Sequence, residues 1–219
     1  SHDKELVLGQ AGIKATRYCK QIMGSSDLVL SFGCRLAPQF VGHDFEIFKN
    51  SYLVSVDIEK DELTKKGCKI NLPINEDLKV FLPIFYKFLK KAKLNNFSKW
   101  NNECNNLKKS KPMIDNSYKR NPIDLYYFMH KVGEISHEKN ILVTDAGSNY
   151  YIGGQVWKFS KGQKELTSGS NAAMGLTVPL SIGAAVAKPN YQILAVTGDG
   201  SLELNIQELK NSQLNTVAI

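Results

Sequence analysis

Four short apolar runs, each ending in a turn of small or polar residues, limit the folds open to this chain. The runs span residues 27–32, 52–58, 140–145 and 192–197. Segments with helical patterns lie between and beyond them, at 13–23, 60–66, 77–91 and from 122 onward. Short strands that alternate with helices form parallel sheets, because a parallel crossover is usually a helix. The predicted fold class is therefore α/β, with two doubly wound parallel-sheet pieces.

The composition fits a globular protein and excludes several other classes. Of the 219 residues, 42% are hydrophobic and 22% are charged, which is too apolar for a disordered chain. The longest weakly polar run, Met174–Ala187, has 14 residues and contains Pro179, so it is too short to span a bilayer. The first ten residues show neither the basic nor the apolar region of a secretory signal. We expect a cytoplasmic protein with no membrane partner.

The four cysteines predict neither a disulfide framework nor a zinc site. They lie far apart in the sequence and form no C-x-x-C pair: Cys19, Cys34, Cys68 and Cys104. None of the histidines forms part of a nucleophile-elbow pattern with a serine or cysteine. We expect four reduced thiols.

The excess positive charge is concentrated in one region. The net charge is +7, yet residues 87–120 hold ten basic and two acidic residues, and the rest of the chain holds 18 basic and 19 acidic ones. The region is rich in asparagine and is broken by Pro112 and Pro122, which is typical of a solvated linker. Its interleaved aromatic residues would also suit a single-stranded nucleic acid, but no nucleic-acid-binding motif accompanies them. We therefore expect a linker and no nucleic-acid partner.

This linker divides the sequence into three predicted segments. Residues 1–92 form the first α/β piece, residues 93–121 the basic linker and residues 122–219 the second α/β piece. In open parallel sheets, ligands bind beyond the carboxyl ends of the strands. The turns that follow the apolar runs are therefore the first places to look for a site.

The last apolar run ends in Gly198-Asp199-Gly200-Ser201, a turn that suits phosphate binding. Glycine lets the backbone approach a ligand closely, and Ser201 is a good residue to cap the helix that follows. The free N–H groups of a first helical turn bind anions, whereas the carboxylate of Asp199 would repel a bare phosphate. A carboxylate at such a site instead suits a phosphate that carries Mg²⁺. The turn favours a metal-bridged diphosphate, although a plain turn has the same sequence pattern.

Other segments carry a resemblance to a known family. They are the loop at 145–149, the small-residue segment SGSNAAMGLTVPLSIGAAVA, and the stretches SSDLVLSFGCRL, YLVSVDIEKDEL and NLPINEDLKVFL. With the turn at 198–200, they resemble in order and spacing the thiamine-diphosphate enzymes of the acetolactate synthase family. The resemblance implies that residues 1–92 are the trailing part of a central domain. It also implies that residues 122–219 are the leading part of a thiamine-diphosphate-binding domain.

The resemblance implies cofactor contacts for several residues and no catalytic residue within this chain. Asp199 would bind Mg²⁺, the metal that bridges to thiamine diphosphate in this family. The diphosphate would be contacted by residues of two loops: Gly198, Gly200 and Ser201, and Gly147, Ser148 and Asn149.

Three further positions bear on the cofactors. Met174 matches the bulky residue that supports the bent conformation of thiamine diphosphate, although a plain place in a helix core would also suit it. Ala172 stands where the family usually has glycine, so its methyl group would crowd the pyrimidine ring. Arg35 matches an arginine that contacts the flavin in FAD-carrying members, but the second arginine of that region is missing. We therefore expect no FAD.

The implied reaction is decarboxylation or carboligation of a small 2-oxoacid. In this family the deprotonated thiazolium carbon attacks the 2-oxoacid, and the ring then serves as an electron sink. The residues do not identify the carbonyl acceptor. By resemblance, the full-length protein is expected to be a homodimer or homotetramer.

The family pattern places two further groups outside these 219 residues. They are the glutamate that activates the pyrimidine ring and an asparagine that is the second metal ligand. We therefore expect a fragment that has no decarboxylase or carboligase activity by itself. A non-catalytic or regulatory module that keeps the diphosphate site is the competing interpretation. A nucleotide-binding Rossmann protein ranks lower, because no G-x-G-x-x-G follows any strand.

Overall fold

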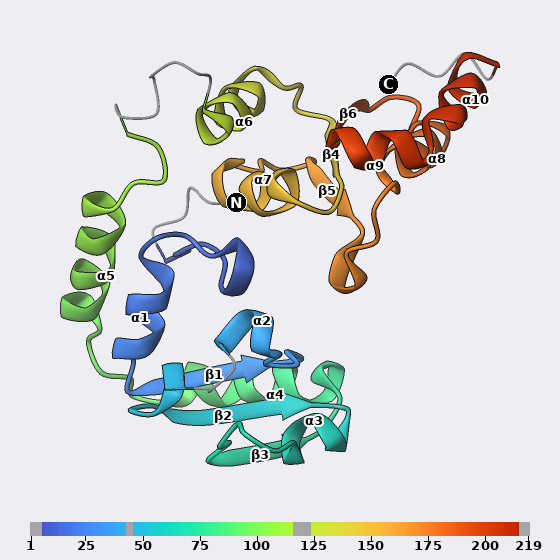
Figure 1. Cartoon of the computed structure of the whole chain (residues 1–219). Helices are drawn as coiled ribbons and strands as arrows, with labels where there is room; N and C mark the ends of the chain where they lie inside the picture. Colours follow the sequence, from blue (N-terminus) through green and yellow to red (C-terminus); the bar gives the residue numbers. More distant parts are fainter. Residues whose placement is uncertain (1–5, 43–45, 116–123, 215–219) are drawn as a thin grey trace. The chain divides into compact units, whose positions relative to one another are not determined.

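The computed structural model describes residues 6–42, 46–115 and 124–214 (Figure 1). Contacts divide the chain into two compact units. The N-terminal unit comprises residues 8–112, and the C-terminal unit comprises residues 113–219 with residues 1–7. The expected end of the linker, at residue 121, and the expected start of the second piece, at residue 122, lie outside the described residues.

A three-stranded parallel sheet forms the centre of the N-terminal unit (Figure 1). Its strands are β1 (Leu28–Phe32), β2 (Tyr52–Asp57) and β3 (Leu72–Asn75), with β2 in the middle. The apolar runs predict β1 and β2 correctly. They do not predict β3, because it has four residues, lies at an edge and contains Pro73, and proline counts against a strand assignment.

Five helices accompany this sheet among the described residues. They are α1 (Cys19–Ser25), α2 (Pro38–Val41), α3 (Lys60–Thr64), α4 (Leu78–Lys91) and α5 (Ser98–Ser110), with 3-10 turns at Gly12–Lys14 and Glu46–Phe48. The helix expected over 13–23 is interrupted. Ala15 has an extended backbone, so the segment forms a 3-10 turn and then, after a break, α1.

Apolar side chains pack against both faces of the β1–β2–β3 sheet. On one face, Leu53 is fully buried in a cluster with Val41 and Phe48. On the other face, Phe32 packs against Phe81 and Phe85 of α4, with ring centroids 5.8 and 5.9 Å apart. These ring contacts hold α4, a helix with no fully buried residue, against this face of the sheet.

The segment expected to be a linker contains a packed helix, α5. Cys104 of α5 is 2% exposed and packs with Tyr18 and Ile22, and Trp100 and Leu107 lie against the same cluster. These three residues of α5 recur at helical spacing and form one apolar stripe on an otherwise polar helix. The description of residues 93–121 as a solvated linker is therefore wrong for Ser98–Ser110. Because this segment is rich in lysine and asparagine, its composition did not reveal the narrow apolar stripe of α5.

A second three-stranded parallel sheet lies at the centre of the C-terminal unit. Its strands are β4 (Asn140–Thr144), β5 (Lys164–Thr167) and β6 (Gln192–Val196), in the order β5-β4-β6. Every residue of β4 is buried, as its apolar run predicts. β5 is an edge strand with the polar sequence KELT, so no apolar run marks it.

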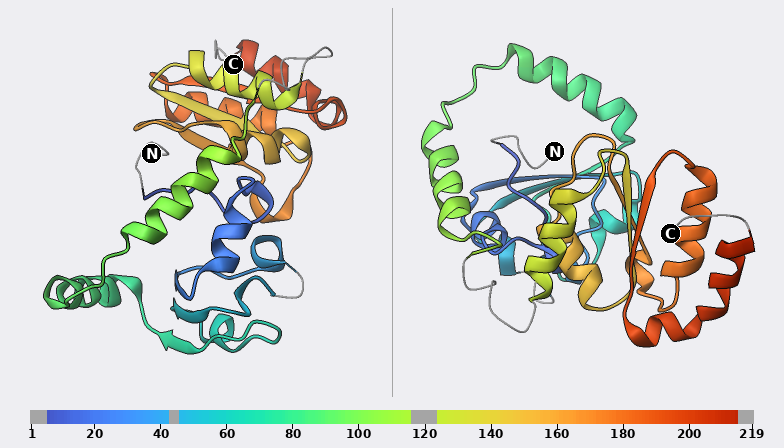
Figure 2. Two further views of the ribbon diagram at one scale, coloured as in Figure 1. Left: turned by 90° about the vertical axis from the view of Figure 1, so that its left-hand side faces the viewer. Right: turned by 90° about the horizontal axis from the view of Figure 1, so that it is seen from above.

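Helices cover both faces of this second sheet, which Figure 2 shows edge-on. α6 (Leu125–Ile135) and α7 (Ser148–Val156) pack on one face, around Met129, Leu142 and Trp157. α8 (Thr177–Ala187) packs on the other face, where Ile141 and Val143 meet Ala184. Successive residues of β4 thus point to opposite helix layers, as strand geometry requires. The chain continues into α9 (Asp199–Leu204), a 3-10 turn (Ile206–Glu208) and α10 (Leu209–Leu214).

Both units are therefore pieces of α/β parallel-sheet folds, as predicted. No helix in the described part of the chain has the length and apolarity needed to cross a membrane.

Candidate functional site

Three loops of the C-terminal unit meet at one edge of its sheet. The ends of its strands are in register, because Thr144 of β4 lies opposite both Thr167 of β5 and Val196 of β6. The loops that follow these strands begin at Asp145, Ser168 and Thr197. All strands run in the same direction, so all three loops leave from the carboxyl edge, where ligands bind in such sheets. Every sequence-predicted cofactor residue lies in or directly after these loops.

Asp145, the first residue after β4, connects the three loops. Its side chain is fully buried, and Oδ1 accepts a hydrogen bond from the Ala146 N–H at 2.8 Å. Oδ2 accepts from the Gly175 N–H at 3.1 Å, and from the N–H and hydroxyl of Thr177 at 3.2 and 3.0 Å. The Thr197 hydroxyl of the third loop lies 3.4 Å from the same oxygen and 3.3 Å from the Gly198 carbonyl, so these two acceptors share its one proton. Sequence reasoning missed this role, and the only signal for it was an acid placed directly after a mainly apolar strand.

Gly175 is held from both sides. Its N–H donates to Asp145, and its carbonyl accepts from Asn205 Nδ2 at 2.7 Å. Its φ is +84°, and a methyl group built on it would lie 2.8 Å from Asn205 Nδ2, so only glycine fits. The segment before α8 is therefore fixed relative to α9. Asn205 is the second positioning residue that the sequence did not reveal.

Met174 precedes this fixed glycine and borders the glycine turn after β6. A methyl group built on Gly200 would lie 3.6 Å from Met174 Cε. The Met174 side chain is 53% exposed and precedes α8, so the alternative of a place in a helix core does not hold. A flexible apolar side chain beside the turn can contact a ligand ring.

The glycine turn itself starts α9 one turn earlier than expected. Gly198 is the N-cap residue, and Asp199 is the first helical residue. Ser201 lies inside the first turn and is 4% exposed, so the expectation that it caps the helix is wrong. The Asp199 side chain is exposed, and its Oδ1 accepts from the Gly200 N–H at 2.9 Å. The turn thus presents one carboxylate beside two glycines.

The loop after β4 provides a second glycine turn. Gly147 is the N-cap of α7, with φ +105°, and Gly147 and Ser148 are both exposed. Asn149 is 6% exposed, and its Oδ1 has no hydrogen-bond partner among the described residues. This loop combines an open backbone with an unsatisfied buried acceptor.

Ala172, in the loop after β5, has a left-handed backbone with φ 48° and ψ 38°. It shares positive φ with Leu36 alone among the described non-glycine residues. Left-handed geometry favours glycine, so the structure gives a backbone reason to expect glycine at this position.

These residues fit a diphosphate and a metal ion. Methyl groups built on Gly147, Gly169 and Gly198 meet no atom within 4 Å, so all three glycines border open space. Buried oxygens without a partner among the described residues lie in or directly beside the same loops: Asn149 Oδ1, Thr167 Oγ1 and Ser168 Oγ. No cluster of three or more His, Cys, Asp or Glu in the described ranges could hold a metal. Mg²⁺ commonly takes one or two carboxylates plus phosphate oxygens, so the single carboxylate of Asp199 agrees with a metal carried on a diphosphate.

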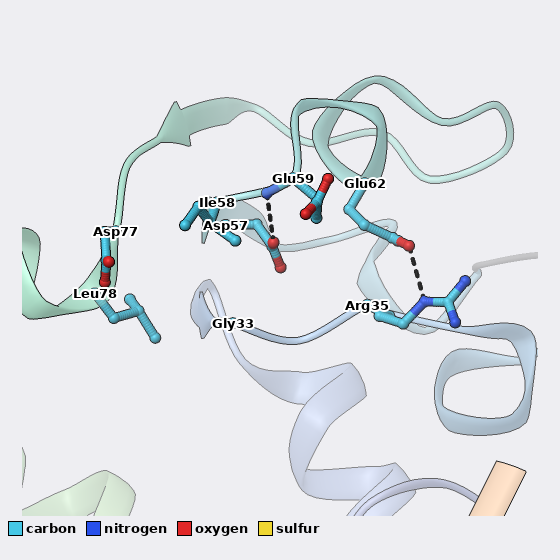
Figure 3. Close-up of a pocket in the computed structure, with 8 residues that line it drawn as sticks. All are labelled: Gly33, Arg35, Asp57, Ile58, Glu59, Glu62, Asp77 and Leu78. Carbon is cyan, nitrogen blue, oxygen red and sulfur yellow. Dashed lines mark hydrogen bonds and ion pairs between the residues drawn. The ribbon is translucent and has the colours of Figure 1, made fainter.

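The N-terminal unit has its own pocket at the carboxyl edge of the β1–β2–β3 sheet (Figure 3). Its volume is about 490 Å³, and it is lined by Gly33, Arg35, Asp57, Ile58, Glu59, Glu62, Asp77 and Leu78. Arg35 Nε donates to Glu62 Oε1 at 2.8 Å, and Glu62 also accepts from Lys65 at 3.0 Å. The hydrogen bond from Lys65, with that from Arg35, lowers the pKa of Glu62 below its ordinary value. The lining thus holds four carboxylates, Asp57, Glu59, Glu62 and Asp77, and one arginine that is paired with Glu62.

Comparison with known proteins agrees with this geometry. Residues 145–218 match the family described as "Thiamine pyrophosphate enzyme, C-terminal TPP binding domain", and residues 1–84 match "Thiamine pyrophosphate enzyme, central domain". The chain is 32% identical to a probable acetolactate synthase large subunit of Methanococcus aeolicus, over 95% of this chain and 37% of that protein. It is 30% identical to acetolactate synthase 1, chloroplastic, of Nicotiana tabacum, over 98% of this chain and 32% of that protein.

A bacterial relative is also an acetolactate synthase large subunit, and the chain again matches about a third of its length. The acetolactate synthase isozyme 1 large subunit of Escherichia coli is 26% identical over 97% of this chain and 36% of that protein. The chain thus spans about a third of the length of the curated relatives it matches.

Proposed function

The chain belongs to the thiamine pyrophosphate enzyme family, and on that basis we propose that it is part of a thiamine-diphosphate- and Mg²⁺-dependent decarboxylase or carboligase similar to acetolactate synthase. The observation that carries the proposal is the meeting of three loops at one sheet edge, with Asp199 beside Gly198 and Gly200. The domain assignments stay part of the proposal: a trailing central-domain part in residues 1–92 and a leading cofactor-binding part in residues 122–219.

Asp199 would hold Mg²⁺, since its carboxylate is exposed at the turn. Gly198 would leave room for the diphosphate, because a methyl group built on it meets no atom within 4 Å, and Gly200 adds no side chain of its own. From the loop after β4, Gly147 and Ser148 would contact the diphosphate through exposed groups, and Asn149 would offer its unsatisfied Oδ1 to a donor on the ligand or on a bound water. Ser201 is buried, so its contact would come from its backbone N–H.

Met174 and Ala172 would lie against the organic part of the cofactor. The exposed thioether of Met174, next to Gly200, would contact the rings of the cofactor. When bound, thiamine diphosphate supplies a nucleophilic carbon and an electron sink for a 2-oxoacid. The contribution of this chain is to bind, orient and partly desolvate that group through the residues named above.

The substrates we propose are a small 2-oxoacid and a carbonyl acceptor, and the full-length protein would act as a homodimer or homotetramer. The acidic lining around Arg35 supports the proposal that no FAD is bound. A non-catalytic module that keeps the diphosphate site is less favoured, because the three curated relatives described above are named as acetolactate synthases. Release of CO₂ from a 2-oxoacid by the natural protein isolated from its source would separate the two.

Titration calorimetry of the chain with thiamine diphosphate, with and without Mg²⁺, tests the site directly. We expect Mg²⁺-dependent binding that Asp199→Asn weakens at least about tenfold, since a metal ligand loses its charge. Glu203→Gln is the matched control, because Glu203 is an exposed acid on the same short helix, and it should leave the affinity unchanged. Equal effects of the two substitutions would contradict the role of Asp199. No binding of thiamine diphosphate by the natural protein isolated from its source would contradict the proposed function.

A further inference from the structure

We propose that Asp145 is a positioning residue of the cofactor site, one that holds the three ligand loops in a single arrangement. This inference rests on the proposed function, because the loops it joins are those assigned to thiamine diphosphate. Asp145 does not contact the ligand itself: it is fully buried beneath the loops.

The hydrogen bonds of Asp145 reach each loop by a separate route. Oδ1 accepts from Ala146 in the loop after β4, and Oδ2 accepts from Gly175 and Thr177 in the segment after β5 and from Thr197 after β6. All the groups that meet this carboxyl are donors. A carboxylate accepts at both oxygens, whereas an amide would turn its own N–H₂ toward at least one donor. The site is therefore specific for an acid.

The hydrogen bond from the Gly175 N–H to Asp145 also restricts the position of Met174, the neighbouring residue that we assign to the cofactor site. Gly175 is pinned by Asp145 at its N–H and by Asn205 at its carbonyl, so Met174 has little freedom along the chain. Met174 in turn borders Gly200 of the diphosphate turn. Loss of the acceptor at Asp145 would thus let Met174 and the glycine turn move apart.

Asp145 also serves the fold, because its bond to the Thr177 N–H satisfies a free donor at the start of α8. A role in positioning must therefore be separated from a role in stability alone. Thr177 allows this separation: it is 1% exposed, and its hydroxyl donates to Asp145. Thr177→Val removes one hydrogen bond at nearly constant volume, and Thr177→Ser keeps the bond.

The experiment measures amide hydrogen exchange of the cofactor-free chain and its affinity for thiamine diphosphate with Mg²⁺. The variants are Asp145→Asn, Thr177→Val and Thr177→Ser, and the control is Met129→Ala, which destabilises the core on the α6–α7 face. We expect Asp145→Asn to speed exchange in all three loops, and to weaken the affinity, by about tenfold or more. Thr177→Val should have a smaller effect of the same kind, and Thr177→Ser should restore values close to those of the unsubstituted chain.

The possible results distinguish a failure of the positioning role of Asp145 from a failure of the proposed function. If Met129→Ala weakens the affinity as much as Asp145→Asn at equal loss of stability, Asp145 is only structural and the inference is overturned. Should Asp145→Asn not fold, Thr177→Val with unchanged exchange and affinity overturns it as well. Faster exchange in the loops of a chain that binds no thiamine diphosphate would uphold the joining of the loops and contradict the proposed function.

Discussion

At the scale of single residues, Ala172 is in a conformation that its side chain opposes. Its φ of 48° brings Cβ close to the following carbonyl, which costs about 1–2 kcal/mol for a residue with a side chain. Ala172 is exposed, so few packing contacts compensate for this cost. The strain is located in a loop that we assign to cofactor binding, where unfavourable backbone geometry is often found.

We predict that Ala172→Gly stabilises the chain by about 0.5–1 kcal/mol. The gain is the relief of the left-handed strain, reduced by the larger conformational entropy that glycine has in the unfolded chain. Urea unfolding measures the difference. Ala173→Gly is the control: Ala173 is not among the positive-φ residues, so this change should destabilise the chain or leave it unaltered. If Ala172→Gly were less stable than the unsubstituted chain, the inference that the backbone of Ala172 is strained would be wrong.

The residues of the site divide by how the sequence encodes them. The turn at Gly198, Asp199 and Gly200, with its exposed carboxylate, could be predicted, because it depends on local backbone freedom and one charge. Asp145 and Asn205 could not be predicted. The partners through which they join separate loops lie 30 residues away along the chain or more, and those contacts exist only once the strands are in register. Long-range hydrogen bonds leave no periodic signal in the sequence.

At the scale of elements, apolarity decided which strands could be predicted. β1, β2, β4 and β6 are continuous apolar runs, whereas β3 and β5 are four-residue edge strands with proline or charged residues. β1 and β6 also lie at sheet edges but are five residues long and mainly apolar, so the short length and the polar or proline content of β3 and β5 explain why no pattern marked them. α5 shows the converse, since its narrow apolar stripe was hidden in a polar composition.

Glu62 connects two elements of the N-terminal unit, because it lies on α3 and binds Arg35 in the loop after β1. Lys65 contributes the larger effect on its pKa, which is lowered. A lowered folded-state pKa gives stability that is present above the unfolded value of about 4.3 and is lost as the pH falls through the folded value. We predict that the difference in unfolding free energy between the unsubstituted chain and Glu62→Gln is constant at neutral pH and shrinks below about pH 4.3.

Urea titrations between neutral and acidic pH measure this difference. Repeating the comparison in Lys65→Met and Arg35→Met backgrounds tests the cause, and Lys65→Met should remove more of the pH dependence. A difference that grows as the pH falls would contradict the sign of the shift.

At the scale of the whole molecule, the chain contains two units that each have their own core. The clusters around Leu53 and around Cys104 belong to the N-terminal unit, and those around Leu142 and Val143 belong to the C-terminal unit. Charge and composition predicted this division, but the boundary in contacts falls between Pro112 and Met113, after α5. The sequence could not show that α5 joins the first unit, because its partners Tyr18 and Ile22 are more than 75 residues away.

Units with separate cores are expected to unfold separately, and the chain has one tryptophan in each. Trp157 is 1% exposed in the C-terminal unit, and Trp100 packs in the N-terminal unit. We predict that Trp100→Phe, which leaves Trp157 as the fluorophore, and Trp157→Phe report urea transitions with different midpoints. Thiamine diphosphate with Mg²⁺ at one hundred times its Kd should stabilise the Trp157 transition by about 2.7 kcal/mol and leave the Trp100 transition unchanged. Coincident midpoints that shift together would show that the two cores unfold as one cooperative unit.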